Sequence, residues 1–197
     1  RCAPVGVPYL RRRGDIRYFS KMENIIHCDA PFVVFFGDAQ DPTFAKTGLG
    51  LAQWRPADCI GQVSLPGCRV DAGIPQYSLA EAKAAGARSL VIGSAAVGGR
   101  VPDNWVPALC EAAALGLDVV AGLHVRLGSL PGLAAAAEKG GVRLIDVRVP
   151  PPGLPVGSGR KRTGMRLLTV GTDCACGKKY TALALDAEMQ RRGLKSD

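Results

Sequence analysis

The sequence predicts an α/β protein with a mostly parallel sheet. Three observations lead to this prediction. Short apolar runs alternate with helical segments between residues 31 and 149, a stretch rich in proline, glycine and basic residues follows at 150–164, and a glycine-flanked turn containing lysine comes after it at 170–181. Strands and helices alternating at this spacing are typical of right-handed βαβ units.

The first expected strand, at residues 31–38, is almost continuously apolar, as expected for a strand buried on both faces of a parallel sheet. Further strands are expected at 60–65, 89–93, 117–122 and 142–147, and helices between them at 43–54, 78–85, 104–115 and 130–139. The second helix opens with Ser78 and Glu81 in a capping-box spacing. These elements predict a Rossmann-like three-layer domain over residues 31–149.

Ligands of such domains bind beyond the carboxyl ends of the strands. That rule predicts one ligand-binding rim formed by residues 37–38, 93–94, 98–99 and 122–124. Trp54 and Trp105 are expected to be packing anchors, since one full domain has to be filled.

The remaining boundaries follow from composition. Residues 1–30 form a basic arm, expected to be disordered, and its first 21 residues contribute +5 of the +8 net charge. Because the charge is concentrated there, we do not expect nucleic-acid binding. Residues 150–164 are an expected linker. Residues 165–197 are expected to start a P-loop domain that is incomplete, since a single strand cannot form a sheet.

Composition also limits the location of the protein. No apolar stretch approaches 18 residues and no signal segment is present, so we expect a cytoplasmic protein without membrane contact. The seven cysteines are scattered without a disulfide or metal-site spacing and are expected to be free thiols, with no metal site.

The most specific motif is the turn at 170–181. An expected strand at 166–170 precedes it and an expected helix, seen most clearly over 182–189, follows it, as in the first strand-loop-helix of a P-loop NTPase-like domain. Backbone N–H groups and the helix dipole favour a phosphate there. The residues expected to bind the cofactor are Gly171, Thr172, Asp173, Cys174, Ala175, Cys176, Gly177, Lys178, Lys179, Tyr180 and Thr181.

The spacing of this loop is unusual. Five residues separate Gly171 from Gly177, and Lys179 stands where a Ser or Thr would hold Mg²⁺. Thr181 comes two positions too late to replace that hydroxyl. The longer form resembles the P-loop of dethiobiotin synthetase, but the lysine favours a metal-free diphosphate such as that of coenzyme A over Mg-ATP.

Several segments together resemble the bacterial D-glutamate N-acetyltransferase family, long described as a domain of unknown function. The matching segments are residues 36–39, 45–50, 61–68, 93–99, 121–127 and 170–184. The resemblance implies a Rossmann-like domain joined to a P-loop domain, and transfer of acetyl from acetyl-CoA to a D-amino acid, with D-glutamate as the expected acceptor. The first 30 residues do not resemble the family.

Four residues are candidates for catalysis or substrate binding. His124, at a strand end, is either a general base or a histidine bonded to the backbone. Asp173 either positions a ligand or caps the helix that follows. Lys46 and Arg126 either pair with the two carboxylates of a glutamate or are solvated charges.

Two other classes of function remain open from the sequence. One is an ATP- and magnesium-dependent ligase or NTPase resembling dethiobiotin synthetase, and the other is a non-catalytic binding or oligomerisation module. For the transferase we expect a small-molecule substrate and a homo-oligomer.

Overall fold

The computed structural model describes residues 28–95, 100–150, 157, 159, 163–172 and 176–196. Backbone contacts divide the chain into two units, residues 1–152 and 153–197. The expected arm up to residue 27, most of the expected linker, the rim residues 98–99 and the loop residues Asp173, Cys174 and Ala175 lie outside the described residues.

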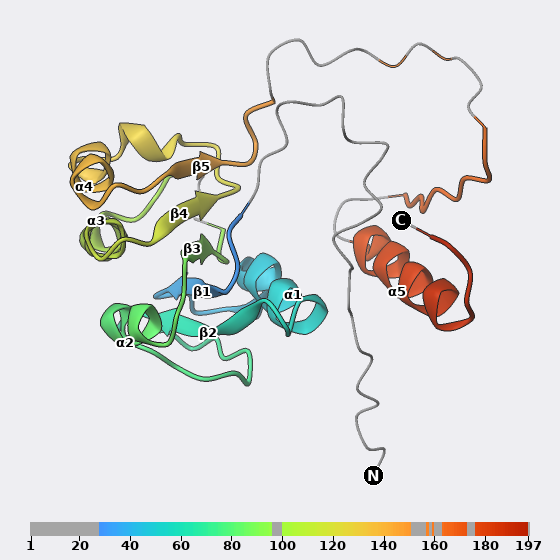
Figure 1. Ribbon diagram of the computed structural model, residues 1–197, viewed down its shortest axis with the longest axis horizontal. Coiled ribbons are helices and arrows are strands. Elements are labelled where there is room, and N and C mark those ends of the chain that lie inside the picture. The colour runs from blue at the N-terminus through green and yellow to red at the C-terminus, as the bar shows by residue number, and fades with distance from the viewer. Residues whose placement is uncertain are drawn as a thin grey trace. The chain divides into compact units, whose positions relative to one another are not determined.

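The first unit contains a five-stranded sheet with the order β2-β1-β3-β4-β5, and every pairing in it is parallel (Figure 1). The strands are β1 (Phe32–Gly37), β2 (Cys59–Ser64), β3 (Ser89–Ile92), β4 (Asp118–Ala121) and β5 (Leu144–Asp146). All six residues of β1 are buried. The five expected strands and the parallel sheet are thereby confirmed, with ends shifted by at most two residues.

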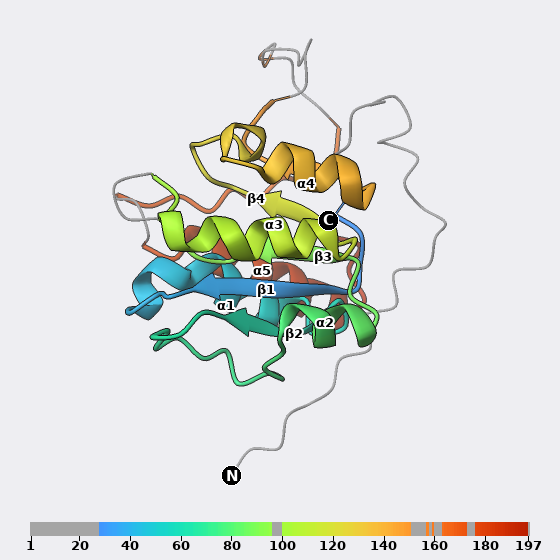
Figure 2. The same ribbon diagram turned by 90° about the vertical axis from the view of Figure 1, so that its left-hand side faces the viewer.

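Helices cover both faces of the sheet, giving the three layers visible in Figures 1 and 2. Among the described residues, α1 (Lys46–Trp54) lies on one face, and α2 (Leu79–Ala84), α3 (Val106–Ala114) and α4 (Leu133–Gly140) lie on the other. Short 3₁₀ turns precede three of these helices, η1 (Pro42–Ala45), η3 (Asp103–Trp105) and η4 (Leu127–Ser129). The helices expected from residues 43 and 104 therefore start as 3₁₀ turns.

The alternation of side chains along the strands creates two apolar cores. Val33 and Phe35 of β1 pack towards α2, α3 and α4, whereas Val34 and Phe36 pack on the face of α1. Trp105 is 2% exposed and its ring meets Phe35 edge-on at 5.5 Å, which confirms it as a packing anchor. The predicted capping box also forms, since Ser78 Oγ accepts from Glu81 N–H and Glu81 accepts from Ser78 N–H.

The second unit contains α5 (Lys178–Arg191). Its exposed surface carries ion pairs from Glu188 to Arg191 and Arg192, both at 2.6 Å, and hydrogen bonds from these two guanidinium groups lower the pKa of Glu188 to about 2. Ion pairs between side chains one helical turn apart therefore stabilise the end of α5.

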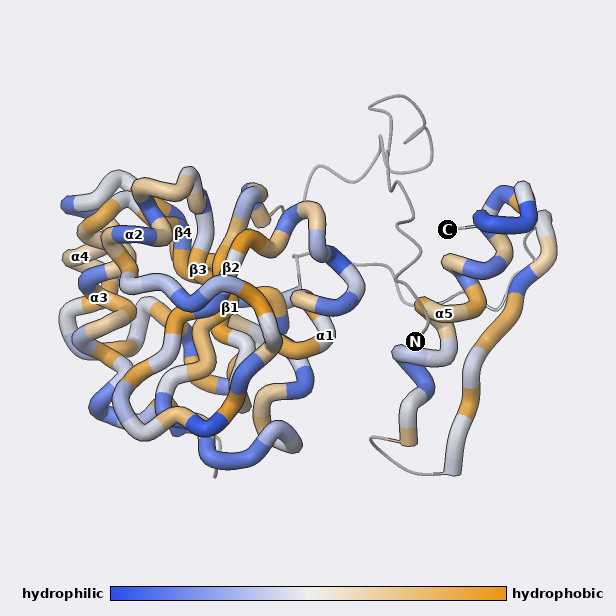
Figure 3. Tube along the Cα trace, turned by 90° about the horizontal axis from the view of Figure 1, so that it is seen from below, coloured by the Kyte–Doolittle hydropathy of each residue, from blue (hydrophilic) through white to orange (hydrophobic). Residues whose placement is uncertain are grey.

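The segment 166–170 differs from expectation, because it forms no strand. Its apolar side chains are exposed, with Leu168 82% and Val170 78% accessible, and Figure 3 shows the apolar character of this extended stretch beside α5. The physical reason is that a strand exists only as part of a ladder, and no described segment pairs with this one.

Candidate functional site

The carboxyl end of β1 was expected to contribute to the ligand rim, but its polar residue is used in packing. Asp38 accepts hydrogen bonds from Trp105 Nε1 at 2.7 Å and Asn104 Nδ2 at 2.9 Å. These two bonds, that of Trp105 first, hold the pKa of the Asp38 carboxyl below its usual value. Asp38 therefore anchors the start of α3.

The carboxyl end of β3 is also engaged with neighbouring backbone. Gly93 O accepts from Gly48 N–H of α1 at 2.9 Å, and Ser94 Oγ, which is buried, donates to Phe36 O at 3.0 Å. In this strand order the direction of winding reverses between β1 and β3, where a ligand crevice is usual. Here α1 packs directly onto that position.

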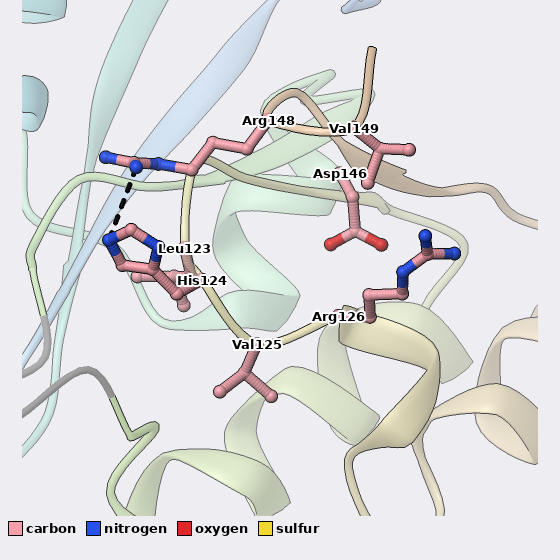
Figure 4. Close-up of a pocket in the computed structure, with 7 residues that line it drawn as sticks. All are labelled: Leu123, His124, Val125, Arg126, Asp146, Arg148 and Val149. Atoms are coloured by element: carbon pink, nitrogen blue, oxygen red, sulfur yellow. Dashed lines mark hydrogen bonds between the residues drawn. The ribbon is translucent and has the colours of Figure 1, made fainter. Parts of the chain in front are cut away.

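A cavity of about 310 Å³ opens instead at the carboxyl ends of β4 and β5 (Figure 4). Two loops enclose it, residues 122–127 after β4 and residues 146–149 at the end of β5. Its lining consists of Leu123, His124, Val125, Arg126, Asp146, Arg148 and Val149. We call this the β4/β5 cavity.

Two contacts hold Arg148 on one side of the β4/β5 cavity. Its Nε donates to Gly122 O at 2.5 Å, and its Nη1 lies 3.3 Å from His124 Nε2 (Figure 4). Because a guanidinium only donates hydrogen bonds, this contact fits an imidazole whose Nε2 accepts and whose proton is on Nδ1. Arg148 thus ties the two loops together and orients His124.

Asp146 and Arg126 lie on the other side of the cavity in Figure 4. Asp146 Oδ1 accepts from Leu127 N–H at 3.0 Å, which joins β5 to η4. Arg126 is exposed and directly precedes η4. One acidic residue, Asp146, and two arginines, Arg126 and Arg148, thus line the same cavity.

The structure brings together two of the predicted residues, His124 and Arg126, and places Lys46 elsewhere, as the first residue of α1. The cation that accompanies Arg126 in the β4/β5 cavity is Arg148. Arg148 and Asp146 were missed by the sequence reasoning, although both come at or just after the last expected strand. Applying the carboxyl-end rule to that strand as well would have found them.

The phosphate-loop candidate belongs to the second unit and is described by itself. Gly177 takes a left-handed conformation with φ of 99° directly before α5, which favours glycine. A Cβ on Gly171 would collide with Cys176 Sγ, so the two ends of the loop lie against each other. Lys178 and Lys179 begin the helix, where the dipole favours anions.

Thr181 is committed to the helix itself. Its N–H donates to Gly177 O at 2.9 Å, and its hydroxyl donates to the same oxygen at 3.1 Å. A threonine hydroxyl bonded to the carbonyl one turn back is an ordinary arrangement within a helix. The Thr181 hydroxyl is therefore already bonded within the helix, which argues against its replacing the magnesium-binding hydroxyl that the loop lacks.

Within the described part of the chain, no group of three or more His, Cys, Asp or Glu side chains is arranged to hold a metal ion. No disulfide links the five cysteines found there, which are Cys28, Cys59, Cys68, Cys110 and Cys176. None of the helices described has the length and apolar character needed to cross a bilayer.

A Rossmann-like parallel sheet followed by a glycine loop and helix defines a two-domain α/β protein with a phosphate-loop motif. Comparison with family models agrees. Residues 63–150 match the Rossmann-like domain of the DUF1611 family, a domain of unknown function, and residues 155–197 match the P-loop domain of the same family. The chain belongs to the DUF1611 family.

Individual relatives extend this finding. The chain is 51% identical over 168 residues to a D-glutamate N-acetyltransferase of Tritonibacter scottomollicae and 40% identical over 167 residues to one of a Pseudoalteromonas species. Each match covers 85% of this chain and 50% of the relative, so the chain spans about half the length of these curated relatives.

A solved structure shows the same likeness. A DUF1611 family protein from Anabaena variabilis ATCC 29413 aligns with a TM-score of 0.65 at 32% sequence identity, over 83% of this chain and 50% of that one. The resemblance stated from the sequence is confirmed at the level of the family and its fold.

Proposed function

We propose that the protein is an N-acetyltransferase that transfers an acetyl group from acetyl-CoA to the amino group of D-glutamate. The observation that carries this proposal is the match to two curated relatives of that name, at 51% and 40% identity over 85% of the chain. The same proposal places the protein in D-amino-acid metabolism. The cysteines among the described residues form no disulfide with one another, which is compatible with a reducing compartment, and we propose the cytoplasm.

The glycine loop before α5 suits the coenzyme diphosphate. Gly177 allows the left-handed turn, the start of α5 favours anions, and Lys178 and Lys179 add positive charge. Acetyl-CoA supplies the activated thioester when bound. The residues expected to hold its phosphates are Gly171, Thr172, Gly177, Lys178 and Lys179.

The alternative, a magnesium-dependent ATPase or ligase, is less well supported by the same loop. The position after Lys178 is Lys179, and the hydroxyl of Thr181 already donates to Gly177 O. Neither residue offers an oxygen to a magnesium ion without a change in the helix start. We therefore favour a diphosphate bound without metal.

The chain must also prepare the amine, because an ammonium ion has no lone pair to attack a thioester. A neutral imidazole is a suitable proton acceptor near pH 7. His124 is a side chain of this type, but its Nε2 already lies 3.3 Å from Nη1 of Arg148. For Nε2 to take a proton from the substrate, Arg148 has to turn towards another partner such as a carboxylate.

Two measurements test the proposal. Thiol release from acetyl-CoA is followed in the presence of D-glutamate, with L-glutamate as the control. In parallel, coenzyme A and Mg-ATP are compared as stabilising ligands, since a ligand at 100 times its Kd that binds only the folded state adds about 2.7 kcal/mol. Release dependent on D-glutamate, with stabilisation by coenzyme A that Lys178→Ala removes and Lys139→Ala retains, supports the proposal. Stabilisation by Mg-ATP alone, or no D-glutamate-dependent release, overturns it.

A further inference from the structure

We propose that the β4/β5 cavity binds the amino dicarboxylate acceptor, with Arg126 and Arg148 each holding one carboxylate and Asp146 holding the ammonium group. This inference rests on the proposed function, because it names the site of that reaction's acceptor. It assigns the acceptor to the Rossmann-like unit, whereas the glycine loop belongs to the other unit.

The first argument is that residues of opposite charge line the cavity without forming an ion pair. Within the described part of the chain, none of Arg126, Arg148 and Asp146 takes part in an ion pair. All three nevertheless line the same space of about 310 Å³. Charges held apart across a small cavity suit a ligand that carries both signs, since each group then finds a partner on the ligand.

The second argument is charge balance. Two guanidinium groups and one carboxylate give the cavity one net positive charge beside a neutral His124. An amino dicarboxylate at neutral pH carries two carboxylates and one ammonium, hence one net negative charge. The groups match in number as well as in sum.

The third argument concerns size and the apolar lining. A volume of about 310 Å³ lies at the lower end of the usual range of about 300–1,000 Å³ for ligand sites, so the cavity suits a small molecule and not a whole coenzyme. Leu123, Val125 and Val149 complete the wall. They offer contact to the methylene groups that separate the two carboxylates of such an amino acid.

Two of the three charged side chains are held in place by hydrogen bonds to the backbone. Arg148 is fixed through Gly122 O at 2.5 Å, and Asp146 through Leu127 N–H at 3.0 Å, which uses one carboxylate oxygen. A carboxylate arriving at Arg148 would also compete for the guanidinium with His124 Nε2. Binding of the acceptor would thereby release the imidazole nitrogen that the proposed reaction needs.

The test is calorimetric titration of the 197-residue chain at low ionic strength with D-glutamate, glutarate and coenzyme A. Glutarate keeps both carboxylates and lacks the amine. Five variants are compared. Arg126→Gln, Arg148→Gln and Asp146→Asn each remove one charge of the cavity, Arg148→Lys keeps the charge, and Arg69→Gln is the control, because Arg69 is exposed and lies outside the cavity. Circular dichroism verifies the folding of each.

We expect Arg126→Gln and Arg148→Gln each to weaken D-glutamate binding by roughly 10- to 100-fold, the range for a lost hydrogen bond to a charged group. Asp146→Asn should weaken the binding of D-glutamate and strengthen the binding of glutarate, because the Asp146 carboxylate attracts the ammonium group of D-glutamate and repels the carboxylates of glutarate. Coenzyme A binding should stay unchanged in all variants, as should D-glutamate binding in Arg69→Gln.

Three results would overturn the inference. The first is that the unmodified chain does not bind D-glutamate, and the second is that D-glutamate binding falls equally in the cavity variants and in the Arg69 control. The third is that coenzyme A binding is lost in Arg126→Gln or Arg148→Gln, which would assign the cavity to the coenzyme's phosphates. Failure of the proposed function is distinguishable. Absent acetyl transfer with the expected binding pattern refutes the function alone, and acetyl transfer with an unchanged KM for D-glutamate in the arginine variants refutes the cavity alone.

Discussion

Replacing Asp38 by alanine tests whether this residue anchors the domain core, as the structure indicates. The carboxylate accepts from Trp105 Nε1 at 2.7 Å and from Asn104 Nδ2 at 2.9 Å. Trp105 is only 2% exposed, so its Nε1 has little access to water when the partner is lost, whereas Asn104 is exposed and can be solvated. The expected cost is therefore that of one buried unpaired donor, about 1–3 kcal/mol.

The assay is urea unfolding followed by tryptophan fluorescence, together with thermal unfolding. For a domain of this size, 1–3 kcal/mol lowers Tm by roughly 4 to 12 °C. Asp38→Asn keeps an acceptor oxygen for Trp105 and should lose less than half as much. Asp103→Asn is the matched control, because this exposed carboxylate lies two residues from Trp105 and accepts no bond from it.

The pH dependence provides a second readout of the same anchor. The folded pKa of Asp38 is lowered, so its contribution to stability is complete above the unfolded value of about 3.9 and is lost as pH falls through the folded pKa. Asp38→Asn should lose this acid sensitivity. Unchanged stability of Asp38→Ala at pH 7, or a loss equal to that of Asp103→Asn, would refute the reasoning.

Three further substitutions probe other parts of the fold by the same denaturation assay. Leu109→Ala removes a fully buried side chain of α3 and should cost about 2–5 kcal/mol, which a value below 1 would contradict. Ser78→Ala removes the capping box with Glu81 and should lower the free energy of unfolding by about 1 kcal/mol, and no measurable loss would contradict a stabilising role of the cap. Arg143→Met leaves the buried carboxylate of Asp118 without its ion-pair partner and should cost about 1–3 kcal/mol, restored in part by the double variant with Asp118→Leu.

The elements of the Rossmann-like unit could be predicted from local patterns. The continuous apolar run of β1 and the capping box at Ser78 are properties of neighbouring residues, and both form as expected. The family could be recognised for the same reason, because its motifs are contiguous segments. The glycine loop was likewise visible from Gly171 and Gly177, and their backbone geometry suits the predicted turn.

Other features depend on segments distant in the chain. Asp38 and Trp105 are 67 residues apart, and only the packing of α3 onto β1 turns a predicted ligand residue into an anchor of the core. The segment 166–170 has the composition of a strand, yet composition cannot supply a pairing partner. In both cases the outcome depends on what lies beside the residue.

The sequence by itself determined the succession of strands and helices along the chain, the glycine loop and the family, because each follows from local periodicity or from contiguous motifs. Only the tertiary structure decided which rim residues meet. It placed α1 against the end of β3, left Lys46 outside the β4/β5 cavity, and brought Arg148 to His124 across 24 residues. The physical reason is that the order of the strands within the sheet and the pairing of β4 with β5 decide which loops come together. Neither can be read from the spacing of residues along the chain.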